Sequence, residues 1–147
     1  MKQTFSTNPT FSLNTSFFPP GTYAVRVWAN QAPSATHYDT FAQSSVILTG
    51  CTSAGVTGST SSSTRGAVVT FTATSSGCPS PKYQFYVRDT SGKWHLMQPF
   101  SNGSATWSTW NNTGWAKGTY YIGVWANQAG SYLKTRQAFG IVAHILT

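Results

Sequence analysis

A long internal repeat constrains the fold of this 147-residue chain more than any other feature. The segment Gly21–Gln31 (GTYAVRVWANQ) returns as Gly118–Gln128 (GTYYIGVWANQ), at an offset of about 97 residues. That spacing exceeds the roughly 20–50 residues of a solenoid repeat and approaches the roughly 100 residues of a small β-sandwich. Residues 1–50 repeat the last half of residues 51–147, whereas nothing repeats residues 51–100. We therefore expect a complete domain over 51–147, preceded by the C-terminal half of a second copy over 1–50.

Hydrophobic residues alternate with polar ones along most of the chain, a pattern typical of half-buried antiparallel strands. The expected strands are 52–57, 66–74, 82–88, 93–98, 104–110, 118–127 and 138–147 in the complete copy, and 9–14, 21–30 and 40–49 in the half copy. The expected inward rows are Val69, Phe71 and Ala73; Tyr83, Phe85 and Val87; Tyr120, Ile122, Val124 and Ala126; and Phe139, Ile141, Ala143 and Ile145. The Ser- and Thr-rich stretch 55–66 is predicted to form a mobile loop. Together these strands indicate an all-β fold, an immunoglobulin-like antiparallel β-sandwich.

Three short motifs resemble a known family. Pro81–Phe85 (PKYQF), Gly92–Trp94 (GKW) and Gly118–Val124 (GTYYIGV) resemble the "three-tyrosine" immunoglobulin-like domains, and related repeats occur in bacterial surface and secreted proteins. The resemblance covers residues 51–147 fully and 9–49 in part. It implies a non-catalytic ligand-binding or spacer module and identifies no binding residues in this chain.

The scarcity of acidic residues excludes several kinds of chemistry. Asp39 and Asp89 are the two acids, against nine Lys and Arg, which gives a net charge of +7. Paired carboxylates for glycoside hydrolysis and a carboxylate cage for Ca²⁺ are therefore not expected. The basic residues form no run, so the pattern does not favour nucleic-acid binding, whereas weak attraction to an anionic polysaccharide or a cell wall fits.

Nucleophilic catalysis finds no local support in the sequence. No GxSxG elbow occurs, and neither acid adjoins a histidine. His37, His95 and His144 are expected at the surface or at strand edges, with His95 facing solvent. We therefore expect a protein that is not an enzyme and needs no cofactor.

Two cysteines, Cys51 and Cys78, lie in the complete copy. A charge-poor, Ser- and Thr-rich β chain indicates an oxidising compartment, in which this pair would form a disulfide. The first cysteine opens the first strand and the other closes the second, which places both at one end of the sandwich. A disulfide there would stabilise the fold by roughly 3 kcal/mol. Two separate buried thiols are the alternative, and without CxxC spacing a metal site is not expected.

These features predict an extracellular or cell-surface location. The chain has no stretch of about 20 apolar residues that could span a membrane. No apolar signal-peptide core follows Met1, so an extracellular chain would be a mature region or fragment of a longer protein.

Exposed aromatic residues form the candidate binding site. The candidate rings are Trp94, Trp107, Trp110, Trp115, Trp125, Tyr86 and Tyr121. Tyr121, Trp125 and Tyr86 alternate with core positions, so they are predicted to stand on the outer sheet surface and stack on sugars. Asn127 and Gln128 would bind hydroxyl groups, and the half copy repeats the set as Trp28, Asn30 and Gln31. The alternative is that Trp125 and Trp28 are core or interface residues and that Asn–Gln turns the chain.

The half copy carries the main functional hypothesis. Its apolar face, formed by Tyr23, Val25, Val27 and Phe41, requires a partner, and its open strand edges favour pairing. Residues 51–100 could pair with either 1–50 or 101–147, so one strand set is left over in every chain. We expect a non-enzymatic repeat module for adhesion or self-assembly, forming a homo-oligomer or pairing with neighbouring repeats through the strands of 1–50. A carbohydrate-binding module or lectin is the alternative function, and a boundary drawn through a longer repeat array is the alternative origin of the half copy.

Overall fold

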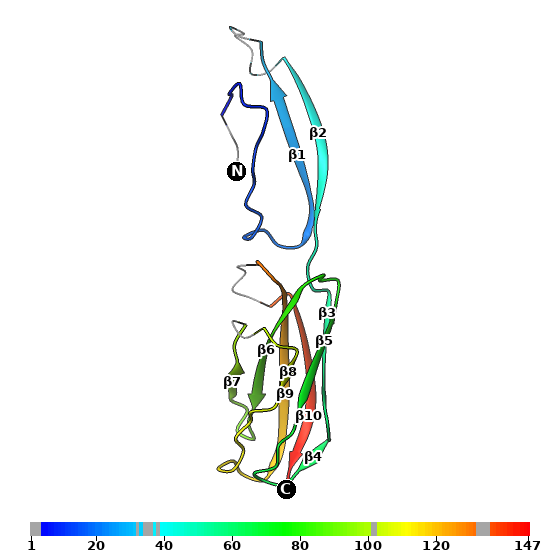
Figure 1. Ribbon diagram of the computed structural model, residues 1–147, viewed down its shortest axis with the longest axis vertical. Coiled ribbons are helices and arrows are strands. Elements are labelled where there is room, and N and C mark those ends of the chain that lie inside the picture. Colours follow the sequence, from blue (N-terminus) through cyan, green and yellow to red (C-terminus); the bar gives the residue numbers. More distant parts are fainter. Residues whose placement is uncertain (1–3, 32, 34–36, 38, 101–102, 132–135) are drawn as a thin grey trace. The chain divides into compact units, whose positions relative to one another are not determined.

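A computed structural model describes residues 4–31, 33, 37, 39–100, 103–131 and 136–147 of the chain. Every regular element found there is a β-strand, which confirms the expected all-β class (Figure 1). The chain divides into two compact units, Met1–Leu48 and Thr49–Thr147. The described residues form no helix long and apolar enough to cross a membrane.

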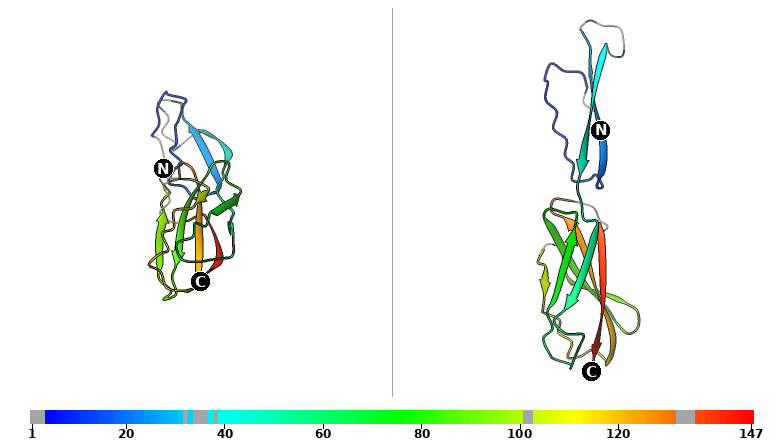
Figure 2. Two further views of the ribbon diagram at one scale, coloured as in Figure 1. Left: turned by 60° about the horizontal axis from the view of Figure 1, so that its bottom comes forward. Right: turned by 90° about the vertical axis from the view of Figure 1, so that its right-hand side faces the viewer.

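The second unit is a β-sandwich, as predicted. Its strands are β3 (Ser53–Gly58), β4 (Ser62–Ser63), β5 (Phe71–Ser76), β6 (Pro81–Arg88), β7 (Trp94–Gln98), β8 (Thr106–Trp107), β9 (Gly118–Gln128) and β10 (Ala138–Leu146). One sheet has the order β4-β10-β9-β6-β7 and the other the order β3-β5-β8 (Figure 2). Every pairing is antiparallel except that of β4 with β10.

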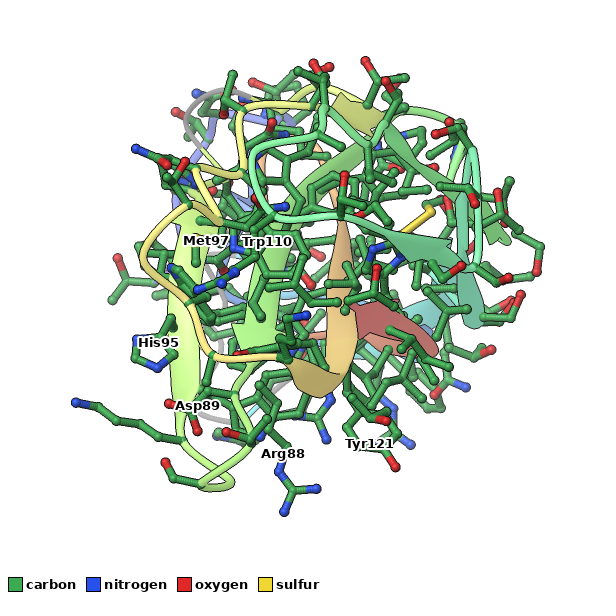
Figure 3. The ribbon with its side chains drawn as sticks, turned by 90° about the horizontal axis from the view of Figure 1, so that it is seen from below. Arg88, Asp89, His95, Met97, Trp110 and Tyr121 are labelled. Carbon is green, nitrogen blue, oxygen red and sulfur yellow. A yellow bond between two sulfur atoms is a disulfide. The ribbon has the colours of Figure 1, made fainter. Side chains whose placement is uncertain are left out.

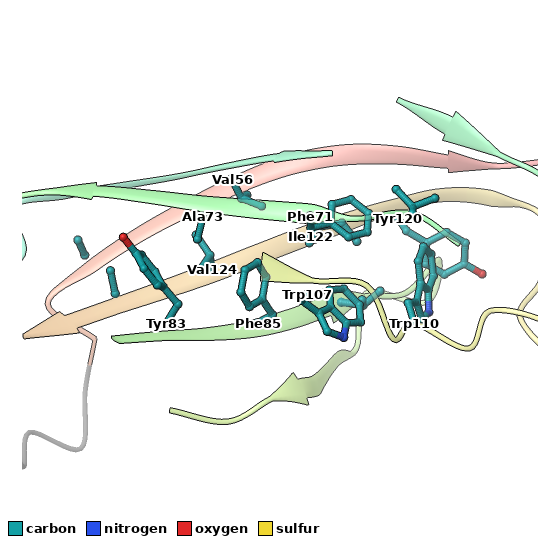
Figure 4. Packing of buried hydrophobic residues seen from close by; sticks show 14 of the residues in the cluster. Val56, Phe71, Ala73, Tyr83, Phe85, Trp107, Trp110, Tyr120, Ile122 and Val124 are labelled. Atoms are coloured by element: carbon teal, nitrogen blue, oxygen red, sulfur yellow. The ribbon is translucent and has the colours of Figure 1, made fainter. Parts of the chain in front are cut away.

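The core lies between these two sheets (Figure 4). The predicted inward rows of the segments containing β5, β6 and β9 are all buried, from Val69 to Ala126. Trp107 and Trp110 close one end of the core, and the Trp107 ring stacks on Phe71 with 5.5 Å between the ring centroids. Burying a large apolar side chain stabilises a fold by about 1.5–3 kcal/mol, so this row accounts for the unit's cohesion.

The inward row predicted for β10 is wrong by one residue. Ala138, Gly140, Val142, His144 and Leu146 face the core, whereas Phe139, Ile141, Ala143 and Ile145 face outward. The reason is the close approach of β3 to β10, because a Cβ at Gly140 would lie 2.6 Å from the carbonyl oxygen of Ala54. Only glycine fits there, and its position fixes which face of the strand is buried.

Three further strand predictions need correction. Residues 9–14 form no strand, since Asn8 Oδ1 and Asn14 Oδ1 accept hydrogen bonds from the backbone N–H groups of Thr10 and Ser16. Such local bonds compete with strand pairing. Only 106–107 of the predicted strand 104–110 pairs, and the predicted loop 55–66 contains the end of β3 and all of β4.

The first unit contains one antiparallel hairpin, β1 (Gly21–Ala29) and β2 (Thr40–Leu48). Its register is that of β9 and β10, because Gly21 pairs with Leu48 as Gly118 pairs with Leu146. The turn before the hairpin is also repeated.

The repeated turn is defined by a tyrosine in each copy. The Tyr23 hydroxyl donates to the carbonyl oxygen of Pro19 at 2.7 Å, and the Tyr120 hydroxyl donates to that of Ala116 at 2.7 Å. Each tyrosine ring meets an aromatic ring five residues earlier, with centroids 5.3 Å apart in both copies. The half copy therefore folds as the C-terminal hairpin of the complete copy.

The two hairpins differ in burial. No described residue of the first unit is buried, and Val27 is 64% exposed, whereas the equivalent Val124 is 0% exposed. The apolar face is also composed differently from the prediction. Phe41 pairs directly with Trp28 and so lies on the opposite side of the hairpin from Tyr23 and Val27. This is the same one-residue shift as in β10.

The predicted disulfide between Cys51 and Cys78 is confirmed, with a Cα–Cα distance of 4.4 Å. Cys51 precedes β3 and Cys78 follows β5, so the bond closes one end of the three-stranded sheet. Gly77 adopts a φ of +80° beside it, and a Cβ there would lie 2.8 Å from the carbonyl oxygen of Gly50. Glycine is therefore required at this turn.

Candidate functional site

The outer face of the five-stranded sheet is largely apolar. Its residues are Phe139, Ile141, Ala143 and Ile145 from β10, Tyr121, Gly123 and Trp125 from β9, Gln84, Tyr86 and Arg88 from β6, and Trp94 and Leu96 from β7. Six of the large apolar side chains on this face have exposed fractions between 36% and 51%. The structure places Tyr86, Tyr121 and Trp125 on this face, where the sequence located them.

Four aromatic rings form a continuous group at the centre of this face, which we name the aromatic cluster: Trp94, Phe139, Trp125 and Tyr86. The centroid of Tyr86 lies 4.8 Å from that of Trp125 and 6.4 Å from that of Trp94. Trp94 meets Phe139 edge to face at 6.2 Å. The rings come from four adjacent strands and contact one another in series.

Gly123 makes the centre of the aromatic cluster possible. A Cβ there would lie 2.9 Å from Trp94 Cζ3 and 3.0 Å from Phe139 Cε2. Any side chain at this position would therefore displace the two rings, which lie over the bare backbone of β9.

Two arginines border the aromatic cluster. The Arg136 guanidinium lies 4.9 Å from the centroid of Phe139 and 5.4 Å from that of Trp125. The Arg88 guanidinium lies 5.9 Å from the centroid of Tyr121, and Figure 3 shows the Arg88 and Tyr121 side chains projecting from the same side of the unit. Contacts of this kind stabilise by about 0.5–1 kcal/mol at exposed sites.

Asn127 and Gln128 were predicted to bind hydroxyl groups beside the exposed rings, but they lie apart from the aromatic cluster. Asn127 is 4% exposed, and its Oδ1 accepts a hydrogen bond from the Gln137 backbone N–H at 2.7 Å. Gln128 Oε1 accepts a bond from the backbone N–H of Ser80 at 3.1 Å. Gln137 Oε1 in turn accepts bonds from the N–H groups of Gln128 and Cys51, at 2.9 Å each. Asn127 and Gln128 end strand β9, and these amides brace the end of the β9–β10 hairpin beside the disulfide.

The described residues of the half copy show no counterpart of the aromatic cluster. Trp28 is exposed and its ring centroid lies 4.8 Å from that of His37, while Asn30 Nδ2 donates to the carbonyl oxygen of His37 at 3.4 Å. The Gln31 N–H donates to Asp39 Oδ2 at 2.6 Å. Arg26 occupies the position of Gly123 and bonds Gln43 Oε1 at 2.5 Å, so the glycine gap is filled.

The remaining candidate rings do not form a surface site. Trp107 and Trp110 are buried in the core, and Trp115 is partly buried against it. Trp110 meets Trp115 edge to face at 5.5 Å and Tyr120 at 5.4 Å. Their role is therefore packing at the end of the sandwich.

His95 was expected to face solvent, but its side chain is only 33% exposed. Its Nε2 lies 2.7 Å from Asp89 Oδ2 (Figure 3). Its ring centroid lies 5.2 Å from that of Trp115. The bond from His95 holds the pKa of Asp89 below its usual range, and the Ser91 hydroxyl and the N–H groups of Ser91 and Lys93 reinforce it. Because the Ser91 hydroxyl donates to Asp89 and not to His95, the geometry describes a braced turn and no nucleophile–base pair.

His144 is fully buried, which corrects its expected place at the surface. Its Nε2 lies 2.9 Å from Ser63 Oγ, and its Nδ1 lies 3.3 Å from the carbonyl oxygen of Thr60. Burial lowers the pKa of His144 because the charged form loses its hydration. The side chain joins β10 to β4 and fills a core position.

No metal site is apparent in the part of the chain that the structure describes, where no three His, Cys, Asp or Glu side chains gather. Comparisons with protein-family models, with curated proteins and with solved structures find no match to this chain. Within the part of the chain that the structure describes, the outer face of the five-stranded sheet and the exposed face of β1–β2 are candidate sites.

Proposed function

We propose that this chain is a non-enzymatic repeat module of an extracellular or cell-surface protein, and that it assembles through its half repeat. The observation that carries the proposal is the β1–β2 hairpin. It has the register and tyrosine turn of β9–β10, yet no described residue around it is buried.

An isolated two-stranded hairpin is marginally stable at best in water. The inward positions of this hairpin include Tyr23, Val25 and Val27, whose equivalents Tyr120, Ile122 and Val124 form the centre of the core in the complete copy. Covering them would stabilise by about 1.5–3 kcal/mol for each large side chain. The natural cover is a set of strands like β3 to β8, provided by a second copy of the chain or by a neighbouring repeat.

Two features support the immunoglobulin-like and extracellular parts of the proposal. The bond from the Tyr120 hydroxyl to the Ala116 carbonyl, just before β9, is the arrangement called a tyrosine corner in immunoglobulin-like sandwiches. The Cys51–Cys78 disulfide is the kind of bond that persists in oxidising compartments. The motifs shared with the three-tyrosine domains favour the same class.

The test is the molar mass in solution of the full chain, measured by light scattering after size exclusion. We expect a multimer for residues 1–147 and a monomer for residues 49–147, which hold a complete core. Val27→Asp should shift the full chain towards monomer because it places a charge on the face to be covered. Ile47→Asp is the matched control, since Ile47 is 71% exposed and lies on the other face of the hairpin.

A monomeric full chain at the highest soluble concentration would contradict self-assembly. Equal effects of Val27→Asp and Ile47→Asp would contradict the assigned face.

A further inference from the structure

The outer face of the complete copy has a chemistry that assembly through β1–β2 does not use. We propose that the aromatic cluster and its two flanking arginines bind an acidic polysaccharide, one whose pyranose units carry carboxylates. This site lies wholly within the Thr49–Thr147 unit, so the inference does not depend on the proposed assembly.

The first argument is the shape and exposure of the rings. Trp94 and Phe139 lie over Gly123 and contact each other, and Trp125 and Tyr86 continue the aromatic surface across β9 and β6. The ring planes of Trp94 and Phe139 meet at 80°, and those of Tyr86 and Trp125 at 44°, so each partly exposed ring offers its own surface to the apolar face of a sugar ring. A large exposed apolar patch on a soluble module also indicates a binding surface.

The second argument is the arrangement of charge. Arg136 lies over Trp125 at one end of the outer face, and Arg88 lies over Tyr121 at the other end, beside the aromatic cluster. Trp125 and Tyr121 are four residues apart on β9, so the two ends are separated by about 13 Å along the strand. Two guanidiniums spaced along this face match a linear polymer that carries repeated carboxylates, which arginine binds in bidentate fashion.

The chain itself cannot neutralise these arginines within the unit. Asp89 is the sole acidic residue of Thr49–Thr147, and it is bonded to His95. A second copy of the chain is a poor occupant, because its outer face brings the same two arginines and its net charge is also +7. The occupant must therefore supply the negative charge.

Single-stranded nucleic acid also stacks on aromatic rings and carries negative charge. It presents one phosphate for each nucleotide and is matched by a continuous basic groove, whereas this face offers two separated arginines. The disulfide also favours an oxidising compartment. The observations favour the acidic polysaccharide, and nucleic acid becomes an outcome of the test.

The test titrates the full chain with oligogalacturonate, a neutral cello-oligosaccharide and oligothymidylate of equal residue number, followed by tryptophan fluorescence and calorimetry. We expect oligogalacturonate to bind most tightly, and its affinity to fall as salt is raised. Arg136→Gln and Arg88→Gln should each weaken binding about tenfold, since each removes a charge-assisted hydrogen bond. Trp94→Ala should weaken it about tenfold through lost stacking.

Arg65→Gln is the matched control. It removes the same charge from the exposed loop between β4 and β5, and its affinity should stay within about twofold of the wild type. The proposal is overturned if no probe binds, if the neutral oligosaccharide binds as tightly as oligogalacturonate, or if oligothymidylate binds more tightly. It is also overturned if Arg65→Gln weakens binding as much as Arg136→Gln, because the effect would then be one of net charge. Near-ultraviolet circular dichroism checks that each variant keeps its packed aromatic residues.

Discussion

Two glycines of the five-stranded sheet face opposite sides of it: Gly140 of β10 faces the core, and Gly123 of β9 lies under the rings of the outer face. At Gly140 a Cβ would lie 2.6 Å from the Ala54 carbonyl oxygen, a backbone atom of a neighbouring strand. At Gly123 it would meet the far ends of the Trp94 and Phe139 rings, which can move. The same substitution should therefore have different consequences at the two sites.

We predict that Gly140→Ala lowers the free energy of unfolding by about 2 kcal/mol, because the sandwich must open to admit one methyl group. Gly123→Ala should cost clearly less stability but should displace the Trp94 ring, seen as a change in tryptophan fluorescence. Urea unfolding of both variants measures the difference. Equal losses of stability would contradict the assigned faces of β9 and β10.

His144 makes the stability of the second unit depend on pH. Burial lowers its pKa below the unfolded value of 6.5, so the unfolded chain binds the proton more readily. The unfolded state then gains protons first as the pH falls, and stability decreases below about pH 6.5 with a slope of at most about 1.4 kcal/mol per pH unit. Asp89 acts in a separate, lower window, because its lowered pKa matters only below the unfolded value of 3.8.

The measurement is the free energy of unfolding of the wild type and of His144→Gln across mildly acid pH. The variant should be less stable at neutral pH, since it loses packing against Phe71, but should show a flatter dependence below pH 6.5. His37→Gln is the control, because His37 is exposed in the first unit. An unchanged slope in the His144 variant would rule out this origin.

At the scale of elements, alternation identified most strands and the inward faces of β5, β6 and β9. It failed at β10, because that strand is apolar on both faces: Phe139, Ile141 and Ile145 on one, Val142 and Leu146 on the other. Period-two patterning does not distinguish two such rows. Gly140 was the available signal, since a glycine within a strand often marks the close approach of another backbone.

The error in the faces of β10 also explains why the candidate site was predicted only in part. Tyr86, Tyr121 and Trp125 lie where their alternation located them, whereas Phe139 was assigned to the core through the error in β10. Arg136 lies in the connection between β9 and β10, outside any strand. Its contact with Trp125 depends on how the chain folds back after β9, which no local sequence pattern specifies. Asn127 and Gln128 follow Trp125 in sequence, but their partner Gln137 comes from the next strand connection.

The tyrosine turn provides a prediction about the elements. Tyr120→Phe removes the hydroxyl that donates to the Ala116 carbonyl oxygen and should destabilise the second unit by about 1 kcal/mol. Tyr23→Phe removes the equivalent bond from the first unit. If the two hairpins are covered alike in an assembly, Tyr23→Phe should lower the stability of the full-chain multimer, whereas Tyr120→Phe should also lower the stability of residues 49–147 alone. Chemical denaturation of the full chain and of residues 49–147 distinguishes these effects.

At the scale of the whole molecule, the two hairpins allow an internal comparison. Amide hydrogens of β9 and β10 should be strongly protected from exchange at all concentrations, because the strands belong to a packed core. Those of β1 and β2 have the same register but no buried side chains, so they should exchange rapidly in dilute solution. Protection of β1 and β2 that rises with protein concentration would confirm that they are covered on assembly. Strong protection at every concentration would show that they are covered within one chain.

The position of the disulfide has a consequence for such an assembly. Cys51 and Cys78 both lie in residues 51–100, the front half of the complete copy. The polypeptide backbone is the sole covalent link between that half and β9 and β10. A front half could therefore release one hairpin and accept another while its own crosslink stays closed. Exchange of subunits would then proceed in the presence or absence of reductant, and the redox state of the surroundings would set how rigid the receiving half is, without locking any partner in place.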